Sequence, residues 1–287
     1  MKRIIIFGAN GMAGHMISNF LKSIRNYEII DVCHSRKLTE NSIQLDIRNI
    51  FEVEGLLKEV NPDIIINCTG ILNDKAERNP LKAIYINSYF PRYLENYCQH
   101  RAVKVIQLSS DCVFLGKDGQ YTEESIKDGQ DIYSLTKSLG EIINDKDLTI
   151  RTSIIGPELK KDGIGLLHWF MSQSGEINGF SGVVWTGVTT LQLAKSINSM
   201  ITADVTGLYH LVPDKTVTKY QLLNIIKQVF KKEIVINEVE IPSIDRSLKN
   251  TRVDFKANIP EYREMISQLF NYMLLNEDIY QMYFNKI

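Results

Sequence analysis

The chain has 287 residues, of which 44% are apolar and 23% charged, and 33 basic residues against 34 acidic ones leave a formal net charge of -1. This balance is close to the average for soluble globular proteins and excludes an intrinsically disordered chain. It offers no basic excess for nucleic acid, and no apolar run approaches the roughly 18 residues that a membrane span needs.

Four cysteines, Cys33, Cys68, Cys98 and Cys112, lie far apart in the sequence. They form no CxxC pair, and no histidine stands at zinc-ligand spacing from them, so we expect no metal site. Scattered thiols of this kind are typical of a cytoplasmic protein. A chain of this length buries a large core, either as one α/β domain or as a domain with a smaller companion.

The first half of the chain alternates short apolar runs with helical patterns. The runs at 3–7, 27–32, 63–67, 103–109 and 148–154 are rich in Ile and Val, as strands buried on both faces are. Segments with helical periodicity lie between them, at 11–22, 50–59, 80–100 and 133–144. This alternation predicts an α/β fold with a doubly wound parallel sheet.

The last third has a different pattern. A Trp-Phe-Met cluster in 163–172 precedes an amphipathic helix at 189–202, a strand at 207–212 and a helix at 218–230 that opens on the capping box Thr218 to Gln221. Segment 234–287 mixes a short strand, a loop and aromatic-rich helices. We assign residues 1–157 to the sheet domain, with the 207–212 strand returning to it, and residues 158–287 mainly to a small substrate-binding lobe.

Three glycines, Gly8, Gly11 and Gly14, follow the first predicted strand in the run GANGMAG at 8–14. Glycine is needed where a turn is tight, where the backbone approaches a pyrophosphate, and where the next helix packs closely on the strand. The N-terminus of that helix supplies N–H groups to the phosphates. Placed between a strand and a helix, this pattern predicts a Rossmann domain that binds NAD(P).

Two signals after the second strand conflict over the choice of cofactor. Asp31 lies 23 residues beyond Gly8, and an acidic residue there accepts hydrogen bonds from the adenosine ribose and favours NAD. Arg36 follows closely, and its guanidinium can pair with the 2′-phosphate of NADP. An ordinary solvated loop explains the basic residues of 34–37 equally well. We favour NADP(H) and keep NAD(H) as the alternative.

Tyr133 and Lys137 form a YxxxK motif, whose spacing places both side chains on one helix face. We expect the buried ammonium to lower the pKa of the phenol, so that Tyr133 becomes a general acid near neutral pH. With 13 tyrosines, about one such pair arises by chance. The motif becomes informative together with Ser109 and Ser110 at the end of the predicted strand 103–109, because ligands of doubly wound sheets bind at the carboxyl ends of strands. A hydroxyl there can stabilise negative charge on a carbonyl oxygen.

Several motifs together resemble an extended short-chain dehydrogenase/reductase. They are the glycine run, NCTG at 67–70, SSDxVF at 109–114 and YxxxK, in this order. Within that superfamily the chain is most similar to the dTDP-4-dehydrorhamnose reductase type, through SSDCVFLG at 109–116, DKAE at 74–77, RTS at 151–153 and GLYHL at 207–211. The resemblance covers about residues 1–230. It implies reduction by NAD(P)H of the 4-keto group of a nucleotide-activated 4-keto-6-deoxyhexose, for surface polysaccharide biosynthesis.

The resemblance also implies roles for individual residues. Ser110 would polarise the ketone oxygen, Tyr133 would protonate it, and Lys137 would bind the nicotinamide ribose and tune Tyr133. The implied cofactor contacts are Gly8, Asn10, Gly11, Met12 and Gly14 at the pyrophosphate, Asp46 and Ile47 at the adenine, Cys68, Thr69 and Gly70 along the cofactor channel, and Asn87 near the active site.

Residues Asp111 and Cys112 distinguish the chain from related enzymes. Similar dehydratases carry Asp-Glu at these positions, so the missing second carboxylate argues against water elimination. In the GDP-fucose synthase type, a cysteine at the offset of Cys112 works with a distant histidine in epimerisation, and His168 is placed to be that partner. This leaves a coupled epimerase-reductase as one alternative, against the interpretation that Cys112 and His168 only pack in the core.

Trp185 and Arg252 are candidates for the nucleotide end of the substrate, with Asp111 and Cys112 near the sugar. An indole can stack on a pyrimidine and a guanidinium can pair with a diphosphate, although core packing and a surface ion pair explain them equally well. We expect a nucleotide sugar as partner, no nucleic acid and no membrane, and the resemblance allows a homodimer. A second alternative is a non-catalytic, NADP-binding regulator, since the regulatory subunit of methionine adenosyltransferase resembles the same group. The intact Ser110, Tyr133 and Lys137 weigh against it.

Overall fold

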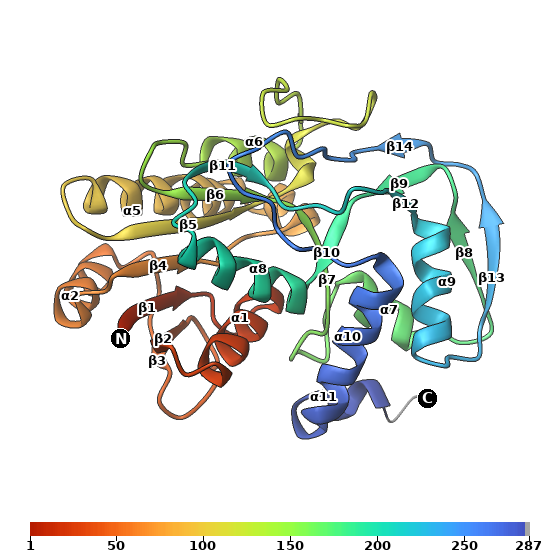
Figure 1. The fold of residues 1–287 in the computed structure, drawn as a ribbon, viewed down its shortest axis with the longest axis horizontal. Coiled ribbons are helices and arrows are strands. Elements are labelled where there is room, and N and C mark those ends of the chain that lie inside the picture. Colours follow the sequence, from red (N-terminus) through yellow and green to blue (C-terminus); the bar gives the residue numbers. More distant parts are fainter. Residues whose placement is uncertain (285–287) are drawn as a thin grey trace.

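The computed structural model describes residues 1–284 and is built on one seven-stranded parallel sheet (Figure 1). The strands are β1 (Lys2–Phe7), β2 (Tyr27–Cys33), β3 (Ile43–Gln44), β4 (Ile64–Asn67), β5 (Lys104–Ser109), β6 (Leu148–Arg151) and β11 (Gly207–His210). Their order is β11-β6-β5-β4-β1-β2-β3, and every pair is parallel. This confirms the doubly wound α/β fold. The order reverses between β1 and β4, where such sheets bind ligands.

Helices cover both faces of this sheet, because alternate residues of each strand point to opposite sides. Ile4 and Ile6 pack on the face covered by α1 (Met12–Ser23) and α8 (Thr190–Thr202). Ile5 and Phe7 pack on the other face, against α2 (Ile50–Val60) and α5 (Phe90–Cys98). Further helices on the sheet domain are α3 (Asn73–Arg78), α4 (Pro80–Ala83) and α6 (Ile132–Leu139), and a 3-10 turn spans Asp111–Val113.

The remaining elements form a lobe beside the sheet (Figure 1). It contains α7 (Leu166–Ser172), α9 (Lys219–Val229), α10 (Tyr262–Leu275) and α11 (Glu277–Phe284). Its strands pair in small sheets: β8 (Glu176–Phe180) with β13 (Val235–Val239), and β9 (Val183–Trp185) between β12 (Val217–Thr218) and β14 (Ile244–Asp245). The capping box of Thr218 and Gln221 starts α9, as its sequence predicted.

Three predicted elements differ from the structure. The run 148–154 is two strands, because the chain leaves the main sheet at Thr152 and β7 (Ser153–Ile155) pairs with β10 (Gly187–Thr189). Segment 80–100 is α4, a π-helical turn (Ile84–Tyr89) and α5 rather than one α-helix. The helix predicted at 133–144 ends at Leu139, because Glu141 turns inward to pair with the buried Arg151.

Within the described residues, no helix combines the length and apolarity that a membrane crossing requires.

Candidate active site

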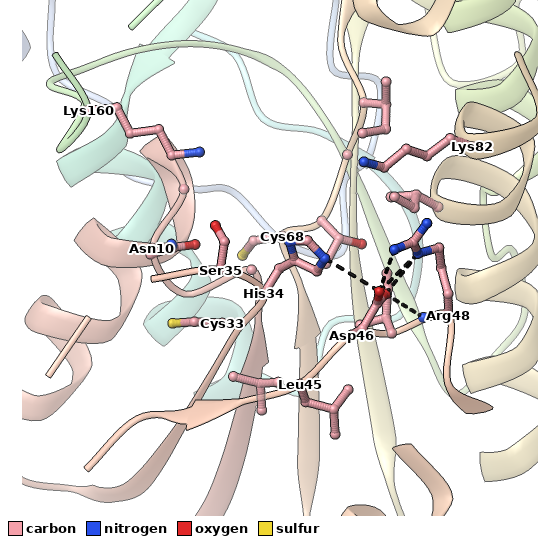
Figure 2. A pocket seen from close by; sticks show the side chains of 18 residues that line it. Asn10, Cys33, His34, Ser35, Leu45, Asp46, Arg48, Cys68, Lys82 and Lys160 are labelled. Atoms are coloured by element: carbon pink, nitrogen blue, oxygen red, sulfur yellow. Dashed lines mark hydrogen bonds and ion pairs between the residues drawn. The ribbon is translucent and has the colours of Figure 1, made fainter. Parts of the chain in front are cut away.

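A cavity of about 250 Å³ opens at the carboxyl ends of β1, β2 and β4 (Figure 2). The glycine loop and the segments that follow β2, β3 and β4 line it, with Gly8, Asn10, Gly11, Cys33, His34, Ser35, Asp46, Ile47, Arg48, Cys68, Thr69, Gly70 and Ile71 among the contributors. Lys82 of α4 and Lys160 of the loop before α7 complete it. The structure therefore gathers here most of the residues assigned to the cofactor from the sequence.

The glycine loop has the shape that a pyrophosphate requires. Gly8 adopts a left-handed φ of 77°, and a Cβ there would lie 3.1 Å from the backbone of Cys68. A Cβ on Gly14 would lie 2.2 Å from the Gly8 carbonyl oxygen, so Gly14 lets α1 pack on β1 and does not itself line the cavity. No side chain caps the start of α1 at Gly11, which leaves its first N–H groups available to an anion. Met12 also lies outside the cavity lining, close to Gly165.

The end of the cavity that the sequence assigned to the adenine is built around Asp46. Arg48 binds its carboxylate with both Nε (3.0 Å) and Nη2 (2.5 Å), and His34 Nε2 lies 3.4 Å from Oδ2. Arg48, the main cause, holds the pKa of this carboxyl well below its usual range. Figure 2 shows Asp46 between His34 and Arg48, with Lys82 near Arg48 and Lys160 across the cavity. Cations therefore outnumber the single carboxylate at this end.

Asp31 was expected to favour NAD and Arg36 to favour NADP. Neither residue lines the cavity. The Asp31 carboxylate is buried beneath β2 and pairs with Lys22 of α1. The Arg36 side chain is exposed, and only its carbonyl reaches the glycine loop, accepting a hydrogen bond from Asn10 Nδ2 at 2.8 Å. The structure thus places neither side chain in the cavity, which Arg48 and His34 line instead.

The predicted catalytic residues converge where β5 ends. The Ser110 hydroxyl donates to Asp111 Oδ1 (3.0 Å) and accepts from the Cys112 N–H (3.1 Å), so it starts the 3-10 turn. Tyr133 is the second residue of α6, whose start is capped by Asp131, and its phenol faces Ser110. One turn later, Lys137 Nζ donates to the Leu108 carbonyl at 2.6 Å.

The pKa of Tyr133 differs from the expectation. Burial, followed by the nearby Cys112, raises the pKa of Tyr133, so Lys137 does not lower it in the chain alone. The reason is the position of the ammonium, which donates to Leu108 at the end of β5. Burial lowers the pKa of Lys137 to about 8, opposed by the carboxylate of Glu141. Cys68, which lines the cavity, also faces Lys137 and thus joins the cavity to the catalytic group.

Asn87 supports both halves of the site. It lies in the π-helical turn, where its Oδ1 accepts from the Ile71 N–H (2.9 Å) and its Nδ2 donates to the Ile71 carbonyl (2.9 Å) and to Thr136 Oγ1 (3.0 Å). These bonds tie the loop after β4, which includes Gly70, to the helix that carries Tyr133. Asn87 therefore positions the segments that carry Gly70 and Tyr133 relative to each other.

Cys112 and His168 lie in different surroundings. Burial raises the pKa of the Cys112 thiol to about 12, with Asp111 adding to the shift, and the thiol lies 3.9 Å from Arg246 Nη1. His168 lies on α7, with its ring nitrogens 3.1 Å from the Tyr283 hydroxyl and 3.1 Å from the Lys161 carbonyl. Within residues 1–284 their contacts share no residue, which favours the packing interpretation for both.

The lobe places Trp185 and Arg252 in structural roles. The Trp185 indole is 4% exposed, donates to Ser153 Oγ (2.8 Å) and packs on Tyr262. Arg252 Nη1 donates to the carbonyls of Thr206 and Leu208 at the start of β11. That is the amino-terminal edge of the parallel sheet, opposite the catalytic group, so Arg252 is corrected as a substrate contact.

Sequence reasoning missed three cations near the site. Arg246 donates from Nε to the Phe114 carbonyl (3.0 Å), and Lys219 faces Asp111 and Cys112 from the start of α9. Below the catalytic group, the buried Arg151 pairs with Glu141, which also accepts from Ser109 Oγ at 2.8 Å. The RTS motif at 151–153 was the one signal for any of them.

Comparisons with known proteins agree with this geometry. The family model described as "RmlD substrate binding domain" matches residues 1–273. The probable low-salt glycan biosynthesis reductase Agl14 of Haloferax volcanii is 27% identical over 74% of this chain and 75% of its own. A dTDP-4-dehydrorhamnose reductase of Streptomyces griseus is 27% identical over 53% of this chain and 49% of its own. The structure of a dTDP-4-dehydrorhamnose reductase from Bacillus anthracis in complex with NADP superposes with a TM-score of 0.81, at 24% identity, over 95% of this chain and 99% of that one.

Proposed function

Because the chain belongs to the RmlD substrate binding domain family, a group of NAD(P)-dependent reductases, we propose that it reduces the 4-keto group of a nucleotide-activated 4-keto-6-deoxyhexose. The observation that carries the proposal is the meeting of Ser110, Tyr133 and Lys137 beside the cavity of the glycine loop. The relatives named as reductases of dTDP-linked sugars and of glycan biosynthesis support this class of substrate, and a role in surface polysaccharide synthesis is part of the proposal.

The cavity fits a dinucleotide with a phosphate-rich centre. Gly8 leaves space where a Cβ would meet the backbone, and the uncapped start of α1 offers N–H groups to the pyrophosphate. We propose that Arg48 and His34 face the adenosine ribose, which favours NADPH over NADH. When bound, the nicotinamide supplies hydride to the ketone carbon.

The chain itself handles the proton. Tyr133 donates its phenolic proton to the ketone oxygen as that oxygen gains negative charge, and the product is an alcohol. The Ser110 hydroxyl, which now donates to Asp111, turns about its Cβ–Oγ bond to donate to the same oxygen. The ammonium of Lys137 stabilises the phenolate that remains. We further propose that the lobe of residues 158–287 holds the nucleotide sugar over these groups.

A panel of dTDP-, UDP- and GDP-linked 4-keto-6-deoxyhexoses tests the reaction, with NADPH or NADH oxidation followed at 340 nm. We expect turnover with at least one of them and a loss of about 10²- to 10⁴-fold in kcat/KM on Tyr133→Phe. NADPH binding, measured by fluorescence, stays intact in that variant, and Tyr89→Phe on the exposed face beyond the site is the matched control. Absence of turnover across the panel overturns the proposal, while an unchanged cellular function of Tyr133→Phe supports the regulatory alternative.

The surroundings of Cys112 lead us to propose reduction without epimerisation. Its thiol stays protonated at neutral pH, with a pKa of about 12, and so is a poor base. Turnover in D2O should therefore place no solvent deuterium on the ring carbons that flank the ketone. Deuterium that enters with intact Cys112 and not with Cys112→Ala contradicts this and supports the coupled epimerase-reductase.

A further inference from the structure

The ammonium group of Lys219 faces the catalytic turn from the lobe. Lys219 is the first residue of α9, and its Nζ lies 5.0 Å from the ring centroid of Trp185. Within residues 1–284 no oxygen lies at hydrogen-bonding or ion-pair distance from this Nζ. The indole attracts the charge but offers no acceptor. A partly buried ammonium without an acceptor is costly, so an oxygen from outside the chain would relieve that cost.

The charges around Lys219 show which ligand would suit it. Asp111 and Cys112 face it from the turn after β5, and the Asp111 carboxylate already accepts from Ser110. Arg246, from the segment after β14, also acts on Asp111, but its Nε is taken by the Phe114 carbonyl. Lys219 and Arg246 thus bring two positive charges to the catalytic turn, where the carboxylate of Asp111 is already engaged by Ser110 and that of Asp131 caps α6.

The position relative to the reacting carbon completes the argument, which rests on the proposed function. The ketone must lie at Ser110 and Tyr133, and in a nucleotide sugar the diphosphate is attached across the hexose ring from that carbon. A cation on the lobe that faces Asp111 and Cys112, next to Ser110, is therefore suited to meet the diphosphate. We propose that Lys219 binds a diphosphate oxygen of the nucleotide sugar and thereby selects nucleoside diphosphate-linked sugars over free ones.

Calorimetric titration of the NADP-loaded protein with dTDP, UDP, GDP and the matching free nucleosides tests this site. For the diphosphate that binds, we expect Lys219→Met to raise the Kd about 10- to 100-fold, the range for loss of one charge-assisted hydrogen bond. The Kd of the free nucleoside and of NADP should not change. Lys219→Arg should keep most of the affinity, and Lys215→Met, at an exposed lysine nearby, should keep all of it.

The pH dependence gives a readout that a structural role would not produce. Burial lowers the pKa of Lys219 to about 8, so the free protein loses this charge as the pH rises through that value. Diphosphate affinity should then fall about tenfold per pH unit above pH 8, and Lys219→Arg should remove the fall because a guanidinium stays charged. Burial raises the pKa of the Cys112 thiol to about 12, so that thiol does not reproduce the effect in this range.

Equal diphosphate affinity in the wild type and Lys219→Met overturns the inference. So does an equal loss for diphosphate and free nucleoside, which indicates a disturbed fold. The inference and the proposed function fail separately. If the protein binds the diphosphate through Lys219 but reduces no sugar of the panel, the inference on Lys219 stands and the proposed reductase activity is refuted. If the protein reduces the sugar but the Kd of the diphosphate is unchanged in Lys219→Met, the proposed activity stands and the inference on Lys219 is refuted.

Discussion

The buried Lys137 makes the reaction sensitive to pH in a range where an ordinary lysine is inert. A lysine usually titrates near pH 10.4, about two units above the range of most enzyme assays. Burial between β5 and α6 lowers the pKa of Lys137 to about 8, with the Glu141 carboxylate opposing the shift. The charged form stabilises the phenolate of Tyr133, so activity is present below pH 8 and is lost as the pH rises through it.

The size of the effect follows from this value. With a pKa of about 8, roughly 0.9 of the Lys137 side chains are charged at pH 7 and roughly 0.1 at pH 9, which predicts a fall of about tenfold in kcat/KM. The measurement is NADPH oxidation at 340 nm with limiting keto sugar and saturating cofactor. Because Lys219 titrates in the same range, the profile is recorded in the Lys219→Arg variant as well.

Two results would refute this reasoning about Lys137. One is a kcat/KM that stays flat through about pH 9.5 in the Lys219→Arg background, and the other is a midpoint near the ordinary lysine value. Lys137→Met serves as the control. Its residual activity should be low and should not change between pH 7 and pH 9, because the titrating group is gone.

Three further predictions concern the cofactor cavity and the network beneath the catalytic group. Arg48→Gln should weaken NADPH binding about tenfold in a fluorescence titration and leave NADH binding nearly unchanged, since it removes a cation and frees a carboxylate facing the adenosine ribose. Arg151→Met should lower the free energy of unfolding in urea by about 3–5 kcal/mol, because it leaves a buried carboxylate without its main partner. Gly14→Ala should abolish NADPH binding, since the new Cβ would lie 2.2 Å from a carbonyl oxygen of the glycine loop.

Each of these has a matched control. Arg36→Gln, an exposed residue in the loop after β2, should leave the ratio of NADPH to NADH affinity unchanged. If this ratio changes in Arg36→Gln and not in Arg48→Gln, Arg36 rather than Arg48 selects NADPH. Replacing Glu141 by Leu together with Arg151→Met should recover most of the lost stability, and a double variant as unstable as the single one contradicts the account. Gly55→Ala, where a Cβ meets nothing within 4 Å, should bind NADPH normally.

The order of elements and the positions of Ser110, Tyr133 and Lys137 at the ends of their elements could be predicted from the sequence because they depend on local patterns. A strand followed by three spaced glycines and a helix defines the turn at Gly8 through backbone geometry alone. The spacing of Tyr133 and Lys137 sets both on one face of α6, and Ser110 follows β5 directly. None of these relationships requires knowledge of what packs against them.

The sequence did not predict which way side chains point at the ends of strands. In a strand, a shift of one residue moves a side chain to the other face of the sheet. Asp31 pairs in register with Ile6, which faces α1, so its carboxylate meets Lys22 beneath the sheet instead of the cofactor cavity. Arg48 lines the cavity from the loop after β3, where the sequence had pointed to Asp46 and Ile47.

Periodicity and short spacings encode the parallel sheet, the glycine loop and the positions of Ser110, Tyr133 and Lys137 within a few residues of chain. Which distant cations meet these three residues depends on how the lobe packs on the sheet. Lys219 and Arg246 approach the turn at Asp111 across more than 100 residues of chain, whereas Arg252, equally plausible as a substrate contact, is held at the opposite edge of the sheet. Long-range packing sets these contacts, and no local pattern in the sequence records it.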